Sequence, residues 1–463
     1  MSSQNSKNGK LLIQAHNTEK GFSIEFNNET FTNEYPETIW NQTPKEIQEF
    51  LIDNLSFATT VHLGMVFPNV NKMIYDTNRP LFEPYFNQNF IYDIPSCAEI
   101  DNHSIPDEIK KFLHLRFTYK DQSLKQPGNY PVDDAFRALI GMSFGKDSLL
   151  TYAVAEEIGL DPEMIYVVEQ SLTYEQKHKT KLAEKFKNEF GKELHILKHD
   201  TGKLRDYEYL KIPKSEYGWG LQNTEYALEF IPYAYALKGK YLLFGNEQST
   251  AETYYDDIYR WKVYPCYDQS HEWTVQLNQM TKLITANTVQ TGSLIEPLMD
   301  MIIQRILIRR YPNYAKYQMS CFTENESGRD YHWCQACNVC AKMYLLSVAS
   351  GMDPRKIGFT KNMLERQNQN LFTIFGQKSD LPYLNSGLGH KEQLFAFYLA
   401  TKNDSSGGLV SIFKESPLYK EARETEEDLR KIFLKIYDSI SVPNELKSDI
   451  YSIYREEMNF FEF

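Results

Sequence analysis

One stretch of the sequence, residues 136–158, constrains the fold more than any other. A short apolar run, 138–142, stops at the six residues Ser143-Phe-Gly-Lys-Asp-Ser148, and apolar residues at helical spacing then continue to Ile158. This pattern predicts a buried strand, a tight turn and the N-terminus of a helix. Such a turn presents unpaired backbone N–H groups and the positive end of the helix dipole. It therefore predicts an anion site, above all for phosphate.

The side chains of this turn suit phosphate as well. Gly145 lets the backbone approach a ligand closely, Ser143 and Ser148 offer hydroxyl donors, and Lys146 adds a compact positive charge. Phe144 limits the turn to conformations that a residue with a Cβ tolerates, and it offers an aromatic ring beside a bound nucleotide. A turn that merely joins a strand to a helix is the alternative, so the rest of the chain has to decide.

Length and charge exclude several classes of protein. The chain has 463 residues, enough for more than one domain, and a formal net charge of −12. That charge argues against a surface that neutralises a nucleic-acid backbone. No apolar stretch reaches the ~18 residues of a membrane helix, and residues 1–10 lack the apolar core of a signal peptide. We therefore expect a cytoplasmic protein without a membrane or nucleic-acid partner.

The pattern of the chain changes twice and predicts three parts. Residues 1–130 are typical of a small α+β domain without a catalytic constellation. Residues 131–345 alternate strands and helices, which predicts an α/β fold with a parallel sheet covered on both faces. Residues 346–463 are predicted to be mostly helical. The expected elements are strands at 138–142, 164–168, 194–197 and 241–244, and helices at 148–158, 174–190, 223–237, 419–440 and 443–460.

Three strand ends are expected to face one crevice. Ligands on a parallel sheet bind beyond the C-terminal ends of its strands. The turn at 143–148, Glu169, and the segment from Gly245 to Glu247 all follow predicted strands. Glu169 and Glu247 can each accept hydrogen bonds from the donors of a guanine-like base, or they can be ordinary loop acids. Both interpretations stay open from the sequence.

Four of the six cysteines lie close together, at Cys321, Cys334, Cys337 and Cys340. In a reducing compartment this clustering favours a metal over disulfides. Four thiolates at this spacing suit tetrahedral Zn²⁺ and leave no coordination position for a substrate, which predicts a structural zinc site. An iron–sulfur cluster is the alternative. The absence of a proline after Cys340 and the distance of Cys321 favour zinc.

The turn at 143–148 resembles the Ser-Gly-Gly-x-Asp-Ser signature of the PP-loop ATP pyrophosphatases, which leave AMP on their substrate. Combined with the cysteines, it resembles the 7-cyano-7-deazaguanine synthase (QueC) family over about 135–345. Smaller features follow the family's order, at Tyr174–His178, Gly245, Tyr254–Asp256 and Pro297–Met299. The chain departs from the family at Phe144 and Glu175, which replace glycines, and at Ile303, which replaces a lysine.

The resemblance implies a PP-loop (HUP-like) fold, ATP and Mg²⁺ as cofactors beside structural Zn²⁺, and a small-molecule deazaguanine substrate. The carboxylate of 7-carboxy-7-deazaguanine would be adenylated, pyrophosphate would leave into the turn, and an amine would then displace AMP to give an amide. The implied ATP-binding residues are Ser143, Phe144, Gly145, Lys146, Asp147, Ser148, Glu169 and Gly245, with Lys146, Asp147 and Ser148 catalytic. The implied substrate-binding residues are Tyr174, His178, Glu247, Tyr254 and Asp256.

Extended relatives of this family are associated with anti-phage defence operons, where they attach a deazaguanine to the N-terminus of a partner protein. The two flanking regions without catalytic residues lead us to expect such a ligase, with a protein acceptor encoded nearby and a homodimeric state. A plain synthase that uses ammonia is the first alternative. A tRNA sulfur-transfer enzyme is disfavoured by the acidic charge. A non-catalytic nucleotide-binding scaffold is suggested by Phe144 and Ile303.

Overall fold

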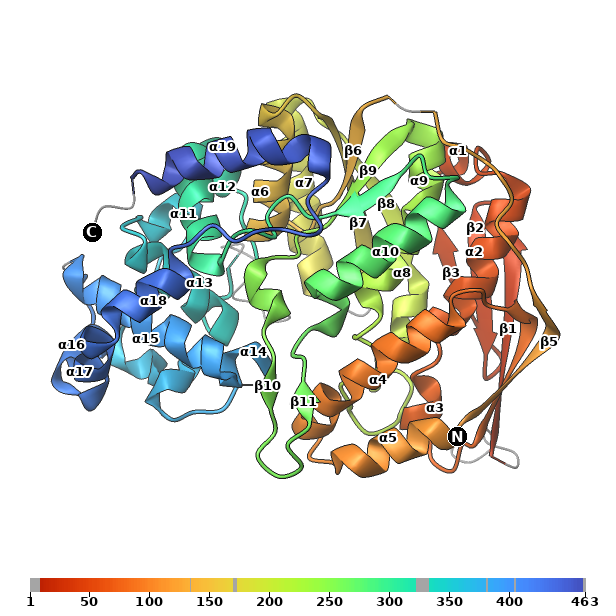
Figure 1. Cartoon of the computed structure of the whole chain (residues 1–463), viewed down its shortest axis with the longest axis horizontal. Coiled ribbons are helices and arrows are strands. Elements are labelled where there is room, and N and C mark those ends of the chain that lie inside the picture. The colour runs from red at the N-terminus through yellow and green to blue at the C-terminus, as the bar shows by residue number, and fades with distance from the viewer. Residues whose placement is uncertain are drawn as a thin grey trace.

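The structure is a computed structural model that describes residues 9–133, 135–169, 173–321, 333–379, 382–403 and 405–460 (Figure 1). The described chain is an α/β protein built on one ten-stranded, mostly parallel sheet with helices on both faces. Its strands are β1 Lys10–Thr18, β2 Gly21–Phe26, β3 Glu29–Glu34, β4 Lys72–Arg79, β5 Arg116–Leu124, β6 Arg137–Gly141, β7 Asp161–Glu169, β8 Leu194–His199, β9 Gly239–Leu243 and β12 Gln290–Gly292. Their order is β12-β9-β6-β7-β8-β3-β2-β1-β4-β5.

The parallel half of the sheet follows the prediction closely. Strands β12, β9, β6, β7 and β8 pair in parallel, and β6 to β9 fall on the four segments where strands were expected. The crossover helices are α6 Lys146–Glu157 and α7 Thr173–Phe190, followed by α8 Gln222–Glu229 and α9 Ile231–Leu237. The single helix expected over 223–237 is thus two helices. Pro232 lies in the first turn of α9, where its missing N–H costs nothing.

The N-terminal part extends the same sheet. Consecutive strands β1, β2 and β3 pair antiparallel, and β4 and β5 add in parallel beside β1. Strand β3 pairs antiparallel with β8 through Asn33 and His199, so the sheet runs across residue 130 without a break. The division of the chain into three domains stays a prediction. The helices of this part are α1 Glu37–Trp40, α2 Lys45–Ala58, α3 Leu63–Val66, α4 Glu83–Ile100 and α5 Ile105–His114.

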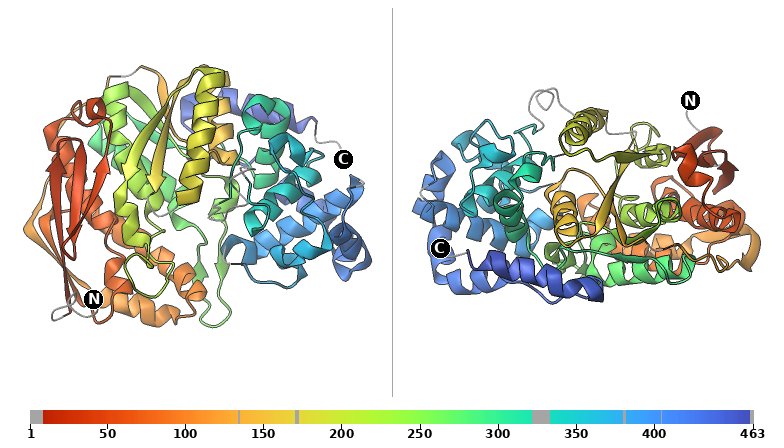
Figure 2. Two further views of the ribbon diagram at one scale, coloured as in Figure 1. Left: turned by 180° about the vertical axis from the view of Figure 1, so that it is seen from behind. Right: turned by 90° about the horizontal axis from the view of Figure 1, so that it is seen from above.

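The C-terminal part is helical and lies at the opposite end of the molecule from the N-terminal strands (Figure 2). The helix expected over 419–440 is divided into two helices at residue 425, and it ends early, because residues 434–443 are not helical. There the buried carboxylate of Glu296 accepts hydrogen bonds from the backbone N–H groups of Ile440 and Ser441. The remaining helices are α10 His271–Ile284, α11 Asp300–Arg310, α12 Pro312–Ala315, α13 Asn338–Ala349, α14 Pro382–Asn385, α15 Gly387–Lys402, α16 Gly408–Glu415, α17 Pro417–Glu424, α18 Glu426–Phe433 and α19 Lys447–Met458.

Alternation along the strands divides the apolar core into two layers. Leu139 and Leu242 point into the layer shared with the N-terminal helices. Ile140 and Leu243 point into the opposite layer, which the C-terminal helices complete. A sheet buried on both faces requires nearly continuous apolar strands, as 138–142 shows. Among the described residues, no helix is both long enough and apolar enough to cross a membrane.

Truncation of a sheet residue tests this core. Leu242→Ala removes a fully buried side chain from β9 and is expected to lower the free energy of unfolding by about 2–5 kcal/mol. Leu12→Ala on β1 is the matched control, since Leu12 is 52% exposed; its effect is expected to stay within about 0.5 kcal/mol. Guanidinium unfolding followed by tryptophan fluorescence measures both. Equal losses would contradict this arrangement of the core.

Candidate functional site

The turn between β6 and α6 is folded as the sequence predicts, and its two serines hold it together. The Gly145 N–H donates to Ser143 Oγ at 3.3 Å, and the Ser143 N–H donates to Ser148 Oγ at 3.3 Å. Ser148 Oγ in turn donates to the carbonyl oxygen of Gly145 at 3.2 Å. Helix α6 begins at Lys146, directly after the turn. The serine hydroxyls therefore shape the turn as well as offering polar groups at the helix N-terminus.

Phe144 keeps a glycine-like backbone despite its side chain. Its φ of 56° lies in the left-handed region that glycine adopts freely and phenylalanine rarely adopts. The ring is fully buried and packs edge-on against Phe186 of α7, with ring centroids 6.0 Å apart. The ring thus packs into the core, and its predicted place beside a nucleotide stays a prediction. Burial of the ring offsets the backbone strain, and the loop keeps its tight shape.

Lys146 is the centre of a buried charged cluster. Its Nζ lies 2.5 Å from Asp147 Oδ1, 2.5 Å from Asp300 Oδ1 and 3.5 Å from Glu247 Oε2, and its side chain is 5% exposed. The cluster joins three elements: the start of α6, the loop after β9 and the start of α11. Gly245 permits this approach, because a Cβ there would lie 2.6 Å from the Cβ of Asp147.

A second lysine, on α13, joins the cluster through Asp300. Lys342 of α13 contacts Asp300, and its Nζ lies 3.1 Å from Glu392 Oε2 on α15. The same Nζ lies 4.3 Å from the ring centroid of Tyr383, a cation–π contact. Neither Asp300 nor Lys342 was identified from the sequence. Asp300 directly follows the Pro-Leu-Met stretch, and Lys342 lies two residues beyond Cys340, so both stood beside features already recognised.

The electrostatics of the cluster follow from burial and close charge pairing. Burial alone lowers the pKa of Lys146, but its three carboxylate partners outweigh burial and raise that pKa well above its usual range. Burial and the neighbouring charge of Asp300 raise the pKa of Glu247 well above its usual range. For Asp300, burial opposes ionisation, yet Lys146 and Lys342 hold its pKa below the usual range. The lysines thus stay charged, and Glu247 retains its proton most readily.

This cluster faces a cavity of about 260 Å³. The cavity is therefore bounded by α6, α11, α13 and α14 and by the loop after β9. Its charged and aromatic lining residues are Lys146, Asp147, Glu247, Asp300, Lys342 and Tyr383. The structure therefore brings three of the predicted site residues, Lys146, Asp147 and Glu247, to a single cavity. Tyr383 and Leu384 come from the C-terminal part, which closes the site from outside the predicted nucleotide-binding part.

Glu169 lies in a different buried network. Its Oε1 accepts hydrogen bonds at 3.1 Å from Arg205 Nη2 and from Gln222 Nε2, and a further bond from the hydroxyl of Tyr226. His199 Nδ1 at the end of β8 lies 3.3 Å from the same oxygen. Glu169 does not line the cavity described above. The ends of β7 and β8 are thus tied to each other and to α8 by this network.

The other predicted substrate residues are placed apart from the cavity. Tyr254 donates its hydroxyl hydrogen to Glu99 of α4. Asp256 lies in the hairpin formed by β10 Tyr254–Tyr255 and β11 Lys262–Val263, where its carboxylate binds backbone N–H groups of the hairpin itself. His178 is buried on α7, and none of these three residues lines the cavity. The side chain of Tyr174 lies outside the described residues.

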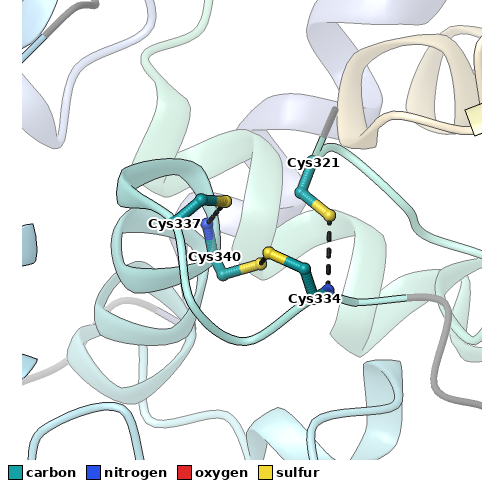
Figure 3. Close-up of side chains that lie close together, drawn as sticks. All are labelled: Cys321, Cys334, Cys337 and Cys340. Atoms are coloured by element: carbon teal, nitrogen blue, oxygen red, sulfur yellow. Dashed lines mark hydrogen bonds between the residues drawn. The ribbon is translucent and has the colours of Figure 1, made fainter. Parts of the chain in front are cut away.

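The four predicted cysteines form one site (Figure 3). Their Sγ atoms all lie within 4.8 Å of one another, a cluster that could bind a structural metal such as zinc. Two backbone N–H groups support the sulfurs: Cys334 N donates to Cys321 Sγ at 3.5 Å and Cys340 N donates to Cys337 Sγ at 3.4 Å. Such donors favour thiolates, the form that binds metal.

The cysteine cluster is joined directly to the turn and to the cavity. Ser320, beside Cys321, accepts a hydrogen bond from the Lys146 N–H at 3.4 Å, and Met319 N donates to the carbonyl oxygen of Phe144 at 2.6 Å. Cys337 caps the N-terminus of α13, the helix that carries Lys342. A metal held by the four thiolates would therefore fix both the segment behind the turn and the helix that supplies the second lysine.

No model of a known protein family and no curated protein sequence matches this chain. The chemistry of the site is therefore inferred from its geometry. That geometry combines a helix N-terminus, one buried and one half-buried lysine and a group of carboxylates at one cavity, with a cluster of four thiols nearby.

Metal analysis tests the cysteine cluster. The purified protein is expected to contain one zinc per chain, and Cys337→Ser is expected to lose most of it, because three ligands hold the ion far less tightly than four. Cys266→Ser is the control, since Cys266 lies outside the cluster. Mass spectrometry of metal content measures both. Iron with a visible charge-transfer absorption would instead identify an iron–sulfur cluster.

The raised pKa of Glu247 gives a pH-dependent prediction for the carboxylate group Asp147, Glu247 and Asp300. A divalent cation binds the ionised carboxylate, so binding releases the proton of Glu247 and tightens as the pH rises through the raised pKa of Glu247. Glu247→Gln is expected to weaken Mn²⁺ binding at least about tenfold and to flatten this pH dependence. Electron paramagnetic resonance titration with Mn²⁺ measures both, with Glu426→Gln as a control in α18. Unchanged affinity in Glu247→Gln would show that the carboxylates bind no cation.

Proposed function

We propose that this chain is an ATP-dependent ligase of the PP-loop type, which adenylates a carboxylate and then transfers the acyl group to an amine. The observation that supports this most directly is the position of Lys146. Lys146 is the first residue of the helix that follows a tight strand–helix turn, and its ammonium group lies at a cavity together with three carboxylates. Polyphosphate binding uses this combination of helix N-terminus, lysine and metal-binding carboxylates.

The charges at the cavity suit a magnesium–nucleotide complex better than a free anion. Two lysines, Lys146 and Lys342, face four carboxyl groups, so the cluster leaves little net positive charge for a polyphosphate unless a cation accompanies it. Oxygens of Asp147, Glu247 and Asp300 lie within 4.8 Å of one another, and carboxylate oxygens are the ligands that Mg²⁺ prefers. The donor set therefore fits Mg²⁺, which would neutralise charge on the phosphate oxygens.

The proposed reaction divides into two steps. A carboxylate oxygen of the substrate attacks the α-phosphorus of ATP, and the bond to the β-phosphate oxygen breaks with release of pyrophosphate. Lys146 and the N–H groups at the start of α6 would stabilise the charge that develops on this leaving group. An amine then attacks the acyl carbon, AMP leaves with the bonding electrons, and the amine loses a proton. The product is an amide.

The identity of the reactants rests on the resemblance of residues 135–345 to the QueC family. It favours 7-carboxy-7-deazaguanine as the carboxylate, and a partner protein's N-terminus as the amine, in a cytoplasmic anti-phage defence system. Residues that match the family and lie together at the cavity or in the cysteine cluster support this proposal, namely Lys146, Asp147, Cys321, Cys334, Cys337 and Cys340. A PP-loop (HUP-like) fold and a homodimeric state belong to the same proposal.

Exchange of labelled pyrophosphate into ATP tests the adenylation step without an acceptor. Exchange is expected to require 7-carboxy-7-deazaguanine and to fall about 100- to 1000-fold in Lys146→Met, since that side chain stabilises the leaving group. Lys402→Met is the control, because Lys402 forms a comparable ion pair with Glu426 on the surface. Zinc content and melting temperature show that each variant is folded.

The other functions give different outcomes in the same assay. Wild-type protein without any carboxylate-dependent exchange would indicate the non-catalytic scaffold. Exchange followed by formation of the free nitrile from ammonia would indicate a synthase in place of a ligase that modifies proteins.

A further inference from the structure

The hairpin of β10 and β11 carries a dense group of exposed apolar side chains. Tyr255 is 57% exposed, Ile258 81%, Tyr259 45% and Trp261 39%, all within seven consecutive positions. The hairpin extends away from the body of the molecule at the lower edge of Figure 1. Single exposed apolar residues are ordinary on protein surfaces, but a contiguous group of large ones marks an interaction site.

The tip of this hairpin is held in one conformation by Asp256. Its carboxylate accepts hydrogen bonds from the N–H groups of Ile258 at 3.0 Å and Tyr259 at 2.6 Å, and from that of Trp261. The Asp256 N–H donates to the carbonyl oxygen of Trp261 at 3.0 Å. The exposed side chains are thus presented on a fixed backbone, which reduces the entropy that binding would cost. Asp256, which is also a predicted substrate-binding residue, organises this tip.

The hairpin is continuous with the walls of the cavity. Ser249 and Thr250, which precede it, and Pro265 and Cys266, which follow it, all line the cavity that holds Lys146. The Thr250 hydroxyl donates to the carbonyl oxygen of Gln269 at 2.9 Å, which ties the two ends of the hairpin segment together. A molecule bound to the tip therefore contacts the same segment whose two ends line the candidate active site.

We propose that the hairpin tip, residues 255–261, docks a second protein, the amine acceptor, whose chain terminus enters the cavity at the base of the hairpin. This inference rests on the proposed ligase function. Tyrosine, tryptophan and arginine dominate the energy of protein–protein contacts, and the tip presents Tyr255, Trp261 and Arg260 together. The net charge of −12 opposes docking of a polyanion such as RNA at the tip.

The test separates docking from chemistry. The double variant Tyr255→Ser/Ile258→Ser leaves the Asp256 hydrogen bonds in place and is expected to keep wild-type carboxylate-dependent pyrophosphate exchange. The double variant is then co-expressed with each protein encoded by a neighbouring reading frame. The N-terminal modification of the acceptor protein, measured by intact mass, is expected to fall at least about tenfold relative to co-expression with the wild-type chain. Leu113→Ser/Leu124→Ser, which removes two exposed apolar side chains on α5 and β5, is expected to modify the acceptor normally.

Photo-crosslinking identifies the occupant directly. A benzophenone amino acid at position 258 is expected to crosslink to the modified protein, and the same group at position 113 is not. Crosslinks to a second copy of this chain, wild-type modification by the hairpin double variant, or no crosslink from position 258 to any co-expressed protein would each overturn the proposal. Absence of pyrophosphate exchange in the wild-type protein would overturn the ligase function itself, because the exchange assay contains no acceptor.

Discussion

The ion pairs of Lys146 are the interaction on which the candidate site depends. A buried ammonium group is stable only when carboxylates surround it, and Lys146 meets Asp147, Asp300 and Glu247 from three separate elements. The pairs therefore hold α6, the loop after β9 and α11 in one arrangement. The same groups that satisfy the lysine also form the oxygen-rich wall of the cavity. Structural and chemical demands coincide at this point.

The surrounding fold supplies the frame that this cluster requires. The parallel strands β6 and β9 are neighbours, so their C-terminal ends place the turn and Glu247 side by side. The thiol cluster anchors the segment behind the turn and the start of α13, and it thereby positions Lys342. The C-terminal helices complete the apolar layer on this face and contribute Tyr383 and Glu392 to the charged cluster. A site of this kind cannot form from the central part of the chain alone.

Much of this arrangement was predictable because local patterns determine local structure. The strand–turn–helix at 136–158, the neighbouring parallel strands and the grouping of four cysteines all follow from apolar periodicity and residue spacing. Long-range consequences were less predictable. Asp300 reaches Lys146, and Lys342 reaches Asp300, from distant segments. Glu169, expected at the ligand, is engaged by Arg205 and Gln222. Periodicity does not encode which side chains meet across a core.

The sequence by itself determined the α/β character of the chain, the polar turn at a helix N-terminus and the four-cysteine site, since each depends on residues near one another in the chain. Only the tertiary structure decided the rest. It placed the ring of Phe144 in the core, used Asp256 to hold a hairpin, and continued the sheet from β8 into β3. These outcomes depend on packing and charge pairing between distant segments, which become defined only when the whole chain is folded.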